Sequence, residues 1–521
     1  MKLKKALFII IFMPLVIWSQ QEFHVFPPNH STTPGMPSGN GSLQKPWDLQ
    51  TALDQLSNTV DGGDTIWLHE GVYSGRYISS LGSSNAKKKI VVDAYQNQKV
   101  VLNGNVASKR GSVLEVRGSH VSFRNIEITF IGEFARKQGE KGFEIVNGLN
   151  HVSGVNCEFI NLKIHNNPGS GLGSWKRTGG TLIYGCTIFN NGYFSTKRGS
   201  GVGMYIQNES NAIRMVKNNI IFNNYYKGVQ VWSASKKAKT SYVKNVTLKN
   251  NVIFNNGLPG KQFRDNIIVA TDDRNGINIA KNIKIIENII YHNTDIKSFQ
   301  NSGHGTSLSL GYRASAPLEA IEVINNVFIG RNYALRFVNA KDLIFKNNTV
   351  YTAYLHFNKS ALNNISKWKF DNNTYFTKNK VPFRVAGSKD YSLNDWKAQH
   401  VIESKSSWQH LKEFNLRNVL TVKQNEYDSS KFTAVLFEKN GANVSVDLSK
   451  FDLKKNQTYD VLNISNGEVL FTGRLSESKI ISMPIGTLNN TNSNFGVFEI
   501  KFDKAAEKKM SFLTRWLKWL F

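Results

Sequence analysis

The sequence predicts an all-β fold in which a long solenoid of short stacked strands is followed by a small antiparallel sandwich. Between about residues 110 and 385 one phrase recurs: a short apolar strand, a loop, and a second strand closed by paired asparagines. Most of the first strands start roughly 27 to 30 residues apart, a period typical of solenoids. They begin at Leu114, Phe143, Leu172, Val202, Val229, Ile267, Leu308, Leu335, Leu355 and Phe383.

Residues 1–20 have the pattern of a secretory signal peptide, so we expect an exported protein. Three lysines precede an apolar run at residues 6–18, which is too short to span a membrane. Residues 21–60 are predicted to form an extended lead-in and an N-terminal cap, with a short helix at residues 47–56. The solenoid is predicted for residues 61–388, and a cap is expected because an open coil exposes unpaired strand edges.

Asparagine pairs close most coils, as at Asn166-Asn167 and Asn190-Asn191. Asparagine tolerates left-handed backbone and hydrogen-bonds its neighbours, so stacked asparagines at equivalent turns should form ladders rather than bind a ligand. Aligned on these pairs, Cys186 lies level with Leu162 and not with Cys157. Both cysteines are therefore predicted to be buried and free, with a disulfide as the alternative.

The pattern changes after the solenoid. Residues 389–418 are predicted to form a linker or cap, and residues 419–503 alternate between short strands and turns, as in an antiparallel sandwich. Residues 504–521 form a basic amphipathic tail rich in tryptophan and phenylalanine. The tail could lie on an anionic membrane surface, or it could dock as a helix onto the sandwich.

The formal net charge of +27 favours a polyanionic partner for an exported protein, most simply an acidic polysaccharide. Solubility alone is the alternative explanation for the charge. The basic residues are scattered and show no nucleic-acid-binding signature, so we expect no nucleic acid. We expect a monomer.

Strict alternation along each strand identifies the side chains that face solvent. It places Trp175, Tyr205 and Trp232 in one outward column on three consecutive coils, about 4.8 Å apart. The same face is predicted to carry Arg177, Gln207, Gln230, Arg313, Arg336 and Glu144. Flat aromatic rings stack on sugar faces and arginine forks hold carboxylates or sulfates, so this face suits an acidic sugar chain. Loops that covered the column would instead make the aromatic residues part of the core.

Two routes of cleavage are open. A lyase that acts on a uronate needs a base for the C5 proton and a cation, arginine or a metal such as Ca²⁺, beside the carboxylate. Tyr205 between Arg177 and Arg313 could serve, with His304 or Lys176 as rival bases. A hydrolase needs two carboxylates about 5 to 9.5 Å apart. Glu115 with Glu144 or Asp272 with Asp273 could supply such a pair.

The mature chain resembles the exported right-handed parallel β-helix proteins of the pectate-lyase-like superfamily. The resemblance rests on the GGDTI run at residues 62–66 with GVY at 71–73, on GVGMYIQN at 201–208, and on the repeated asparagine pairs. It implies a right-handed parallel β-helix over most of residues 45–385, but it does not assign a reaction, because members include lyases, hydrolases, uronate epimerases and proteins without known activity.

Family motifs that would assign a reaction are lacking or out of place. The Asn-Gly-x-Glu pattern of the chondroitinase B and alginate lyase family is not evident, and the Asp-Pro-His-Asp motif of mannuronan epimerases is absent. Asp272-Asp273 and Gly303-His304-Gly305 are similar to polygalacturonase motifs, but the aspartate pair follows its strand and Gly-x-Gly recurs elsewhere in the repeat. We therefore expect an exported protein that binds and cleaves an acidic polysaccharide, with β-elimination favoured. The alternatives are a glycoside hydrolase, a uronate epimerase, and a non-catalytic binding or envelope-assembly protein.

Overall fold

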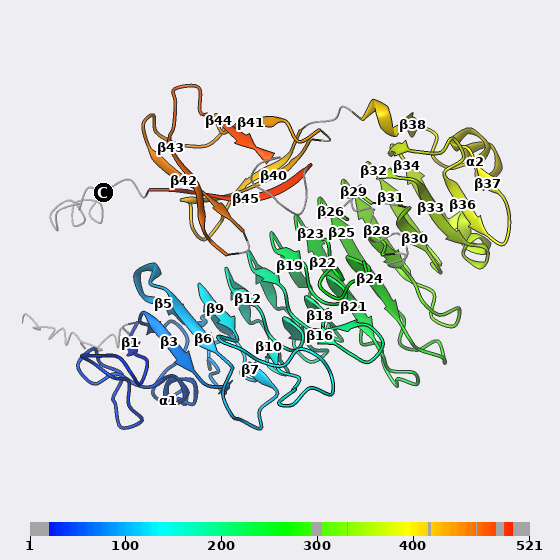
Figure 1. Ribbon diagram of the computed structural model, residues 1–521. Helices are drawn as coiled ribbons and strands as arrows, with labels where there is room; N and C mark the ends of the chain where they lie inside the picture. Colours follow the sequence, from blue (N-terminus) through cyan, green and yellow to red (C-terminus); the bar gives the residue numbers. More distant parts are fainter. Residues whose placement is uncertain are drawn as a thin grey trace, which may run out of the picture.

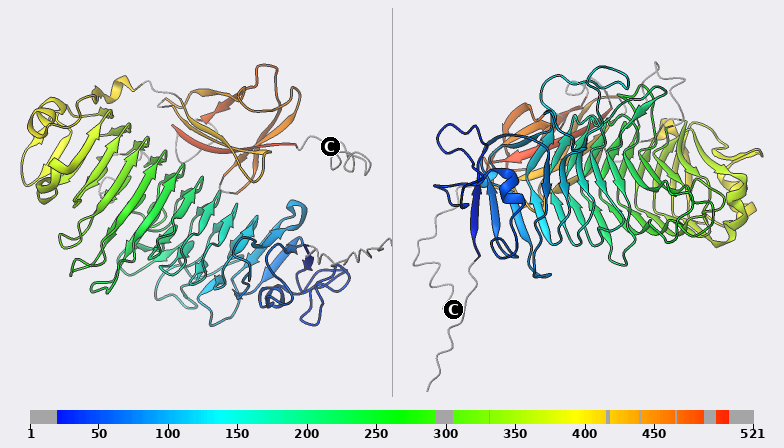
Figure 2. Two further views of the ribbon diagram at one scale, coloured as in Figure 1. Left: turned by 180° about the vertical axis from the view of Figure 1, so that it is seen from behind. Right: turned by 90° about the horizontal axis from the view of Figure 1, so that it is seen from below.

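A computed structural model of the chain describes residues 20–292, 305–330, 332–414, 418–438, 440–464, 466–485 and 494–503. Its main body is the predicted right-handed parallel β-helix, in which the chain winds through three long sheets (Figures 1 and 2). Each sheet has twelve strands within these ranges, and neighbouring coils pair in parallel apart from one antiparallel pair at the far end. The signal peptide, apart from Gln20, and the C-terminal tail lie outside the described residues.

Sheet A begins the solenoid, because its first strand lies in the predicted lead-in. Its strands are β1 (Glu22–Val25), β2 (Thr65–Leu68), β5 (Ile90–Ala94), β8 (Val121–Arg124), β11 (Glu158–Ile160), β14 (Leu182–Tyr184), β19 (Arg214–Lys217), β22 (Lys244–Lys249), β25 (Lys281–Ile286), β28 (Glu319–Ile324), β31 (Leu343–Lys346) and β34 (Trp368–Asp371).

Sheet B follows sheet A in each coil, and its last strand lies in the predicted linker. Its strands are β3 (Gly71–Ser74), β6 (Val100–Asn103), β9 (Ile126–Thr129), β12 (Lys163–His165), β15 (Thr187–Phe189), β20 (Ile220–Phe222), β23 (Val252–Phe254), β26 (Ile289–Tyr291), β29 (Val327–Ile329), β32 (Thr349–Thr352), β35 (Thr374–Thr377) and β38 (Ser407–His410).

Sheet C completes each coil and forms the wall on which the sequence places its candidate site. Its strands are β4 (Tyr77–Ser79), β7 (Ser112–Val116), β10 (Asn147–His151), β13 (Leu172–Ser174), β18 (Met204–Ile206), β21 (Val229–Ser233), β24 (Ile267–Thr271), β27 (Leu308–Leu310), β30 (Tyr333–Phe337), β33 (Tyr354–Asn358), β36 (Phe383–Ala386) and β37 (Asp390–Tyr391).

Helices and short hairpins complete the solenoid. The predicted capping helix is α1 (Leu49–Leu53), whose first turn is capped by the Asp48 carboxylate. At the other end, α2 (Leu393–His400) buries Trp396 against the last coils. The remaining short elements are β16 (Tyr193–Phe194), β17 (Gly199–Ser200), η1 (Tyr95–Asn97), η3 (Lys359–Lys367) and η4 (Leu411–Glu413).

The predicted asparagine ladders are present inside the solenoid. In the longer ladder each side-chain amide donates to the side-chain oxygen of the next asparagine, through residues 219, 251, 288, 326, 348 and 373. The last amide, of Asn373, donates to the buried carboxylate of Glu403. These bonds satisfy buried turns where the chain passes from sheet A to sheet B. Cys157 and Cys186 are buried and free, as predicted.

The C-terminal domain has the predicted antiparallel sheets and folds back onto the outer face of sheet B (Figure 1). Phenylalanines 189, 222 and 254 stack along that face, and Phe495 stacks on Tyr291 with ring centroids 4.0 Å apart. The strands are β39 (Val419–Gln424), β40 (Lys431–Phe437), β41 (Asn443–Asp447), β42 (Thr458–Asn463), β43 (Val469–Arg474), β44 (Ile480–Pro484) and β45 (Phe495–Phe502). No helix in the described ranges is long and apolar enough to cross a membrane.

Candidate functional site

The candidate site lies on the outer face of sheet C, where alternate side chains of β13, β18 and β21 point away from the core. The inward residues Leu172, Met204 and Val229 are fully buried. Tyr205 on β18 is half-buried and lies directly beside Gln230 of β21. Trp175 follows β13 and is 37% exposed. The face is therefore open to solvent.

The three aromatic residues share this face, but they do not form the single column that we predicted. Strand pairing sets Tyr205 level with Gly173, two positions before Trp175. Continued by one residue, the same register places Gln207 between Trp175 and Trp232. Tyr205 nevertheless meets Trp175, with ring centroids 5.0 Å apart. Trp232 contacts Tyr312 of a later coil instead.

A register error of two residues explains the difference. The run at residues 199–203 is Gly-Ser-Gly-Val-Gly and contains two overlapping Gly-x-Gly patterns, and the strand predicted from Val202 follows the first of them. The structure pairs Gly171 with Gly203, because the glycine before the first inward residue lies against the asparagine ladder. A Cβ on Gly203 would come within 2.8 Å of the Asn224 amide nitrogen. Gly148, Gly171 and Gly228 occupy the same place in their coils.

Side chains of this face surround an open hollow of about 480 Å³. Its walls combine aromatic rings with two cations and an amide. The lining residues are Val152, Trp175, Lys176, Arg177, Tyr205, Gln207, Ser233, Ala234, Ser235 and Tyr242. None of them is acidic. The hollow therefore offers flat apolar surface and positive charge to a ligand, without a carboxylate that would repel an anion.

Trp175 is held in position from both sides. Its indole Nε1 donates to Asn150 Oδ1 over 2.6 Å. Beneath it, the buried guanidinium of Arg214 donates to the carbonyl oxygen of Trp175 over 3.3 Å and to Thr178 Oγ1 over 2.6 Å. Two of these three bonds fix the turn that carries the ring, and the indole bond fixes the ring itself. The aromatic platform is therefore preorganised.

Tyr205 keeps its phenolic proton at neutral pH. Burial raises the pKa of Tyr205, and the hydrogen bond that Gln207 donates to its hydroxyl over 3.4 Å offsets this only in part. Gln207 also donates to the carbonyl oxygen of Trp232 over 3.1 Å, which ties the two coils together. A phenol with a raised pKa is suited to donate a proton to a leaving group and poorly suited to remove one.

Arg313 and Asp272 form a separate ion pair, with Nε and Oδ1 2.5 Å apart. The pair belongs to the coils of β24 and β27. The coil of β27 is three coils from Tyr205 of β18, or roughly 14 Å at the usual strand spacing. The structure therefore does not bring Arg313 and Tyr205 to one reacting atom. Of the two predicted arginines, Arg177 lines the hollow with Tyr205.

The predicted carboxylate pairs are engaged elsewhere. We predicted a strand from Phe143, but β10 begins at Asn147, so Glu144 lies in the preceding loop. Its carboxylate accepts a hydrogen bond of 2.9 Å from the buried guanidinium of Arg76. Glu115 pairs with Arg117 over 2.6 Å. Asp273 is buried and accepts a backbone bond from Ile277 within its own loop.

The other predicted residues are spread along the face. Gln230 lies beside Tyr205, and Arg336 is exposed on β30, four strands from β18 in sheet C. His304 lies outside the described residues. Within the described ranges no three His, Cys, Asp or Glu side chains gather to form a metal site. The Ca²⁺ ion stays a prediction.

Two features of this face were not predicted. Lys176 places its Nζ 3.6 Å from the ring centroid of Tyr242, a loop residue that no periodic pattern identifies. Near the start of the next strands of the sheet, the largely buried Asp265 is paired with Lys227 at 2.8 Å. Burial raises the pKa of Asp265, but Lys227 and hydroxyl donors outweigh it and lower the pKa overall. A charged residue just before a buried strand was the available signal.

No protein-family model and no curated protein matches this chain. Solved structures similar to it include pectate lyase Pel9A, 17% identical over 64% of this chain and 77% of that one, with a TM-score of 0.41. The A-module of the mannuronan C-5 epimerase AlgE4 of Azotobacter vinelandii is 11% identical over 69% and 94%, at 0.37. The GH136 lacto-N-biosidase of Eubacterium ramulus is 10% identical over 75% and 68%, at 0.40. At these identities the likeness concerns the fold alone.

Proposed function

We propose that the protein binds an acidic polysaccharide in the hollow beside Trp175 and cleaves it by β-elimination. The observation that carries this proposal is the lining of the hollow: the contacting rings of Trp175 and Tyr205, the cations Lys176 and Arg177, and no acidic residue. Aromatic faces bind sugar rings and the cations attract a carboxylate or sulfate. A hydrolase would need two carboxylates close to the scissile bond, which this lining lacks.

The residues suggest a division of labour. In β-elimination a base removes the C5 proton, a C4–C5 double bond forms, and the C4–O bond breaks with protonation of the leaving oxygen. Arg177 and Lys176 would stabilise the negative charge that develops on the uronate carboxylate. Tyr205 would give its proton to the leaving oxygen, because its raised pKa keeps it protonated. Of the two rival bases predicted from the sequence, His304 and Lys176, we propose His304 as the base, because Lys176 is assigned here to the carboxylate.

A panel of uronic-acid and sulfated polysaccharides tests the proposal. Ultraviolet absorbance detects the unsaturated product of a lyase, and reducing-end assays detect hydrolysis. Tyr205→Phe should abolish the ultraviolet signal and leave binding nearly intact, whereas Arg177→Gln should weaken binding. Arg117→Gln, a second exposed arginine beside sheet C, is the matched control.

Each outcome has a distinct meaning. Reducing ends without ultraviolet absorbance would replace β-elimination by hydrolysis, and retention without product would make the protein a binder. Full activity in both Tyr205→Phe and Arg177→Gln would remove the hollow from the reaction.

We also propose that the protein is exported and that its basic tail contacts an anionic membrane surface. Residues 1–20 and 504–521 support this through their charge and apolar pattern alone. Cell fractionation of the full chain, compared with a chain ending at residue 503, tests both parts. Recovery of both chains in the same soluble fraction would contradict membrane contact, and an intact leader in the cytoplasm would contradict export.

A further inference from the structure

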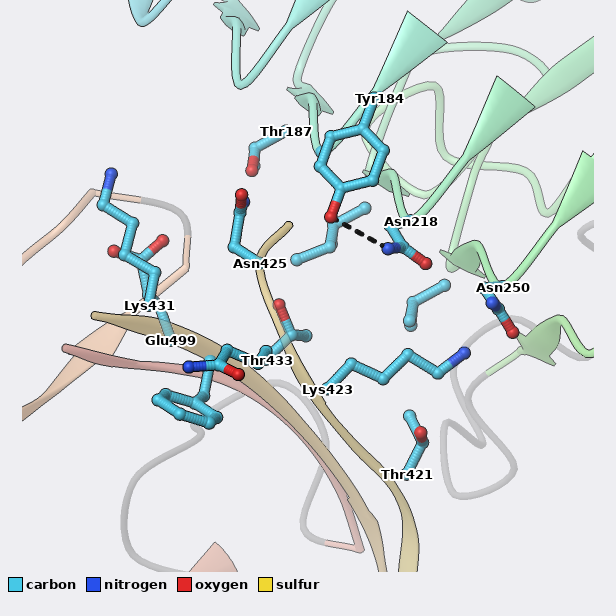
Figure 3. Close-up of a pocket in the computed structure, with 15 residues that line it drawn as sticks. Tyr184, Thr187, Asn218, Asn250, Thr421, Lys423, Asn425, Lys431, Thr433 and Glu499 are labelled. Atoms are coloured by element: carbon cyan, nitrogen blue, oxygen red, sulfur yellow. Dashed lines mark hydrogen bonds between the residues drawn. The ribbon is translucent and has the colours of Figure 1, made fainter. Parts of the chain in front are cut away.

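A second basic site lies on the other side of the solenoid, where the C-terminal domain approaches the turns between sheets A and B. The aromatic contact on sheet B holds the domain in place, and polar residues bridge its margin. Asn425 Nδ2 donates to Asn161 Oδ1 over 2.8 Å, and the Glu426 amide donates to the Tyr184 hydroxyl over 2.7 Å. The two parts meet without closing the margin, which leaves a groove (Figure 3).

The interdomain groove consists of three linked hollows of about 210, 160 and 50 Å³. Lys431 of β40 lines all three, and Lys163 of β12 lines the larger two. Together they exceed the lower end of the volume range of ligand pockets, about 300 Å³. The groove runs along the coil turns, so an extended chain could lie along it.

The groove has an excess of positive charge. Its lining includes four lysines, Lys99, Lys163, Lys423 and Lys431. The acidic lining residues are Glu127 and Glu499, and Glu127 already accepts a 2.9 Å hydrogen bond from His165. The nearest carboxylate contact of Lys431 is a distant 3.8 Å pairing with Asp428. Cationic groups therefore remain available for an anion.

Lys423 is the most desolvated of these cations. Its side chain extends from β39 toward Asn250 on the solenoid (Figure 3). Burial lowers the pKa of Lys423 to about 8, and the charges of Lys249 and Lys217 act in the same direction against the opposite effect of Glu287. A bound anion would relieve this repulsion.

The smallest hollow contains two buried oxygen atoms that lack hydrogen-bond donors in the described part of the chain. The side-chain oxygens of Asn218 and Asn250 line it, are buried, and have no hydrogen-bond partner within the described residues. A buried acceptor without a partner carries an energetic cost that a bound hydroxyl or water removes. The hollow has room for such a group but not for a sugar ring. Hydroxyl donors beside an anionic group are what an acidic sugar provides.

We propose that the interdomain groove is a second binding site for an acidic saccharide, with an anionic sugar residue between Lys163 and Lys431 and a hydroxyl directed at Asn218 and Asn250. The site lies across the solenoid from the hollow beside Trp175 and does not depend on catalysis there. The C-terminal domain would thus be one wall of a saccharide site rather than only a cap on sheet B.

Calorimetric titration of the full chain tests the proposal with three probes: a uronate hexasaccharide, a sulfated hexasaccharide and a neutral hexasaccharide of similar length. We expect Lys163→Gln/Lys431→Gln to weaken one class of anionic site by about a hundredfold, since each lost charge-assisted bond costs about tenfold. Trp175→Ala should leave that class unchanged. Lys87→Gln/Lys88→Gln removes the same charge from an exposed loop and should change nothing.

The result separates this site from the first one. If the uronate and sulfated hexasaccharides differ in affinity, the tighter one identifies the anion that the groove prefers. If the neutral hexasaccharide binds equally well, the proposal is overturned. Full retention of all sites in Lys163→Gln/Lys431→Gln would overturn it too. Single Lys163→Gln and Lys431→Gln variants, each expected to give a smaller loss, serve if the double variant does not fold.

Discussion

His151 should make the stability of the solenoid fall steeply below pH 6.5. The imidazole is fully buried beneath the Trp175 turn, with Nδ1 3.3 Å from Ser174 Oγ. Burial, and secondarily the charge of Arg214, lowers the pKa of His151 from 6.5 to about 3. The unfolded chain therefore binds a proton between pH 6.5 and 3 that the folded chain excludes, so stability is lost as the pH falls through that window.

The magnitude follows from the size of the shift. Each pH unit inside the window costs about 1.4 kcal/mol, so lowering the pH from 7 to 5 should remove about 2 kcal/mol through this group alone. Urea unfolding followed by tryptophan fluorescence at a series of pH values measures the loss. His151→Phe keeps the shape of the ring and cannot titrate, so its stability curve should be flatter by that amount.

Two measurements can refute this reasoning. Parallel stability curves for the wild-type chain and His151→Phe would show that the histidine does not enter the linkage. An NMR titration in which the His151 ring takes up its proton near pH 6 in the folded protein would show that the site is not desolvated. A difference in the free energy of unfolding between the two proteins at pH 8, where the histidine is neutral in both states, reports only the change in packing.

Three further predictions concern the ladder, the glycine position and the interdomain groove. Asn288→Ala should cost about 2–5 kcal/mol in urea unfolding, because two buried donors of Asn251 lose their acceptor; a loss below 1 kcal/mol would contradict the ladder's role. Gly203→Ala should cost about 1–3 kcal/mol through overlap with the next coil, whereas Gly111→Ala, with open space around it, should be neutral. Saccharide binding in the groove should weaken as the pH rises through about 8, and Lys423→Gln should remove that dependence in calorimetry.

The regular part of the fold was predictable from the sequence because each coil repeats the same physical solution. A buried asparagine at the turn, a glycine beside it and an inward apolar residue recur together, as at Asn224, Gly203 and Met204. The long-range contacts were not predictable. Nothing local in Phe495 indicates that it stacks on Tyr291, about two hundred residues earlier, and the interdomain groove depends on this and the other contacts between the two parts.

Glu144 shows why a site residue can be misplaced in a chain whose fold is predicted correctly. The run from Phe143 alternates like a strand and follows a glycine, but a Cβ on that residue, Gly142, would have nothing within 4 Å. The glycine that lies against the asparagine ladder is Gly148, and the strand forms there. Alternation alone therefore identifies strand character and not strand register. The buried Arg76 then pairs with Glu144, a contact that no pattern along the chain contains.

The error at Tyr205 was less damaging for a physical reason. Side chains alternate with a period of two, so a slip of one residue would have turned the whole strand inside out, whereas a slip of two keeps every side chain on its own face. Tyr205 moved along sheet C by two positions, or roughly 7 Å, and still meets Trp175. Predictions of which residues share a solenoid face are thus robust to register, but predictions of which residues touch one substrate atom are not. Contact between catalytic groups must come from the pairing itself.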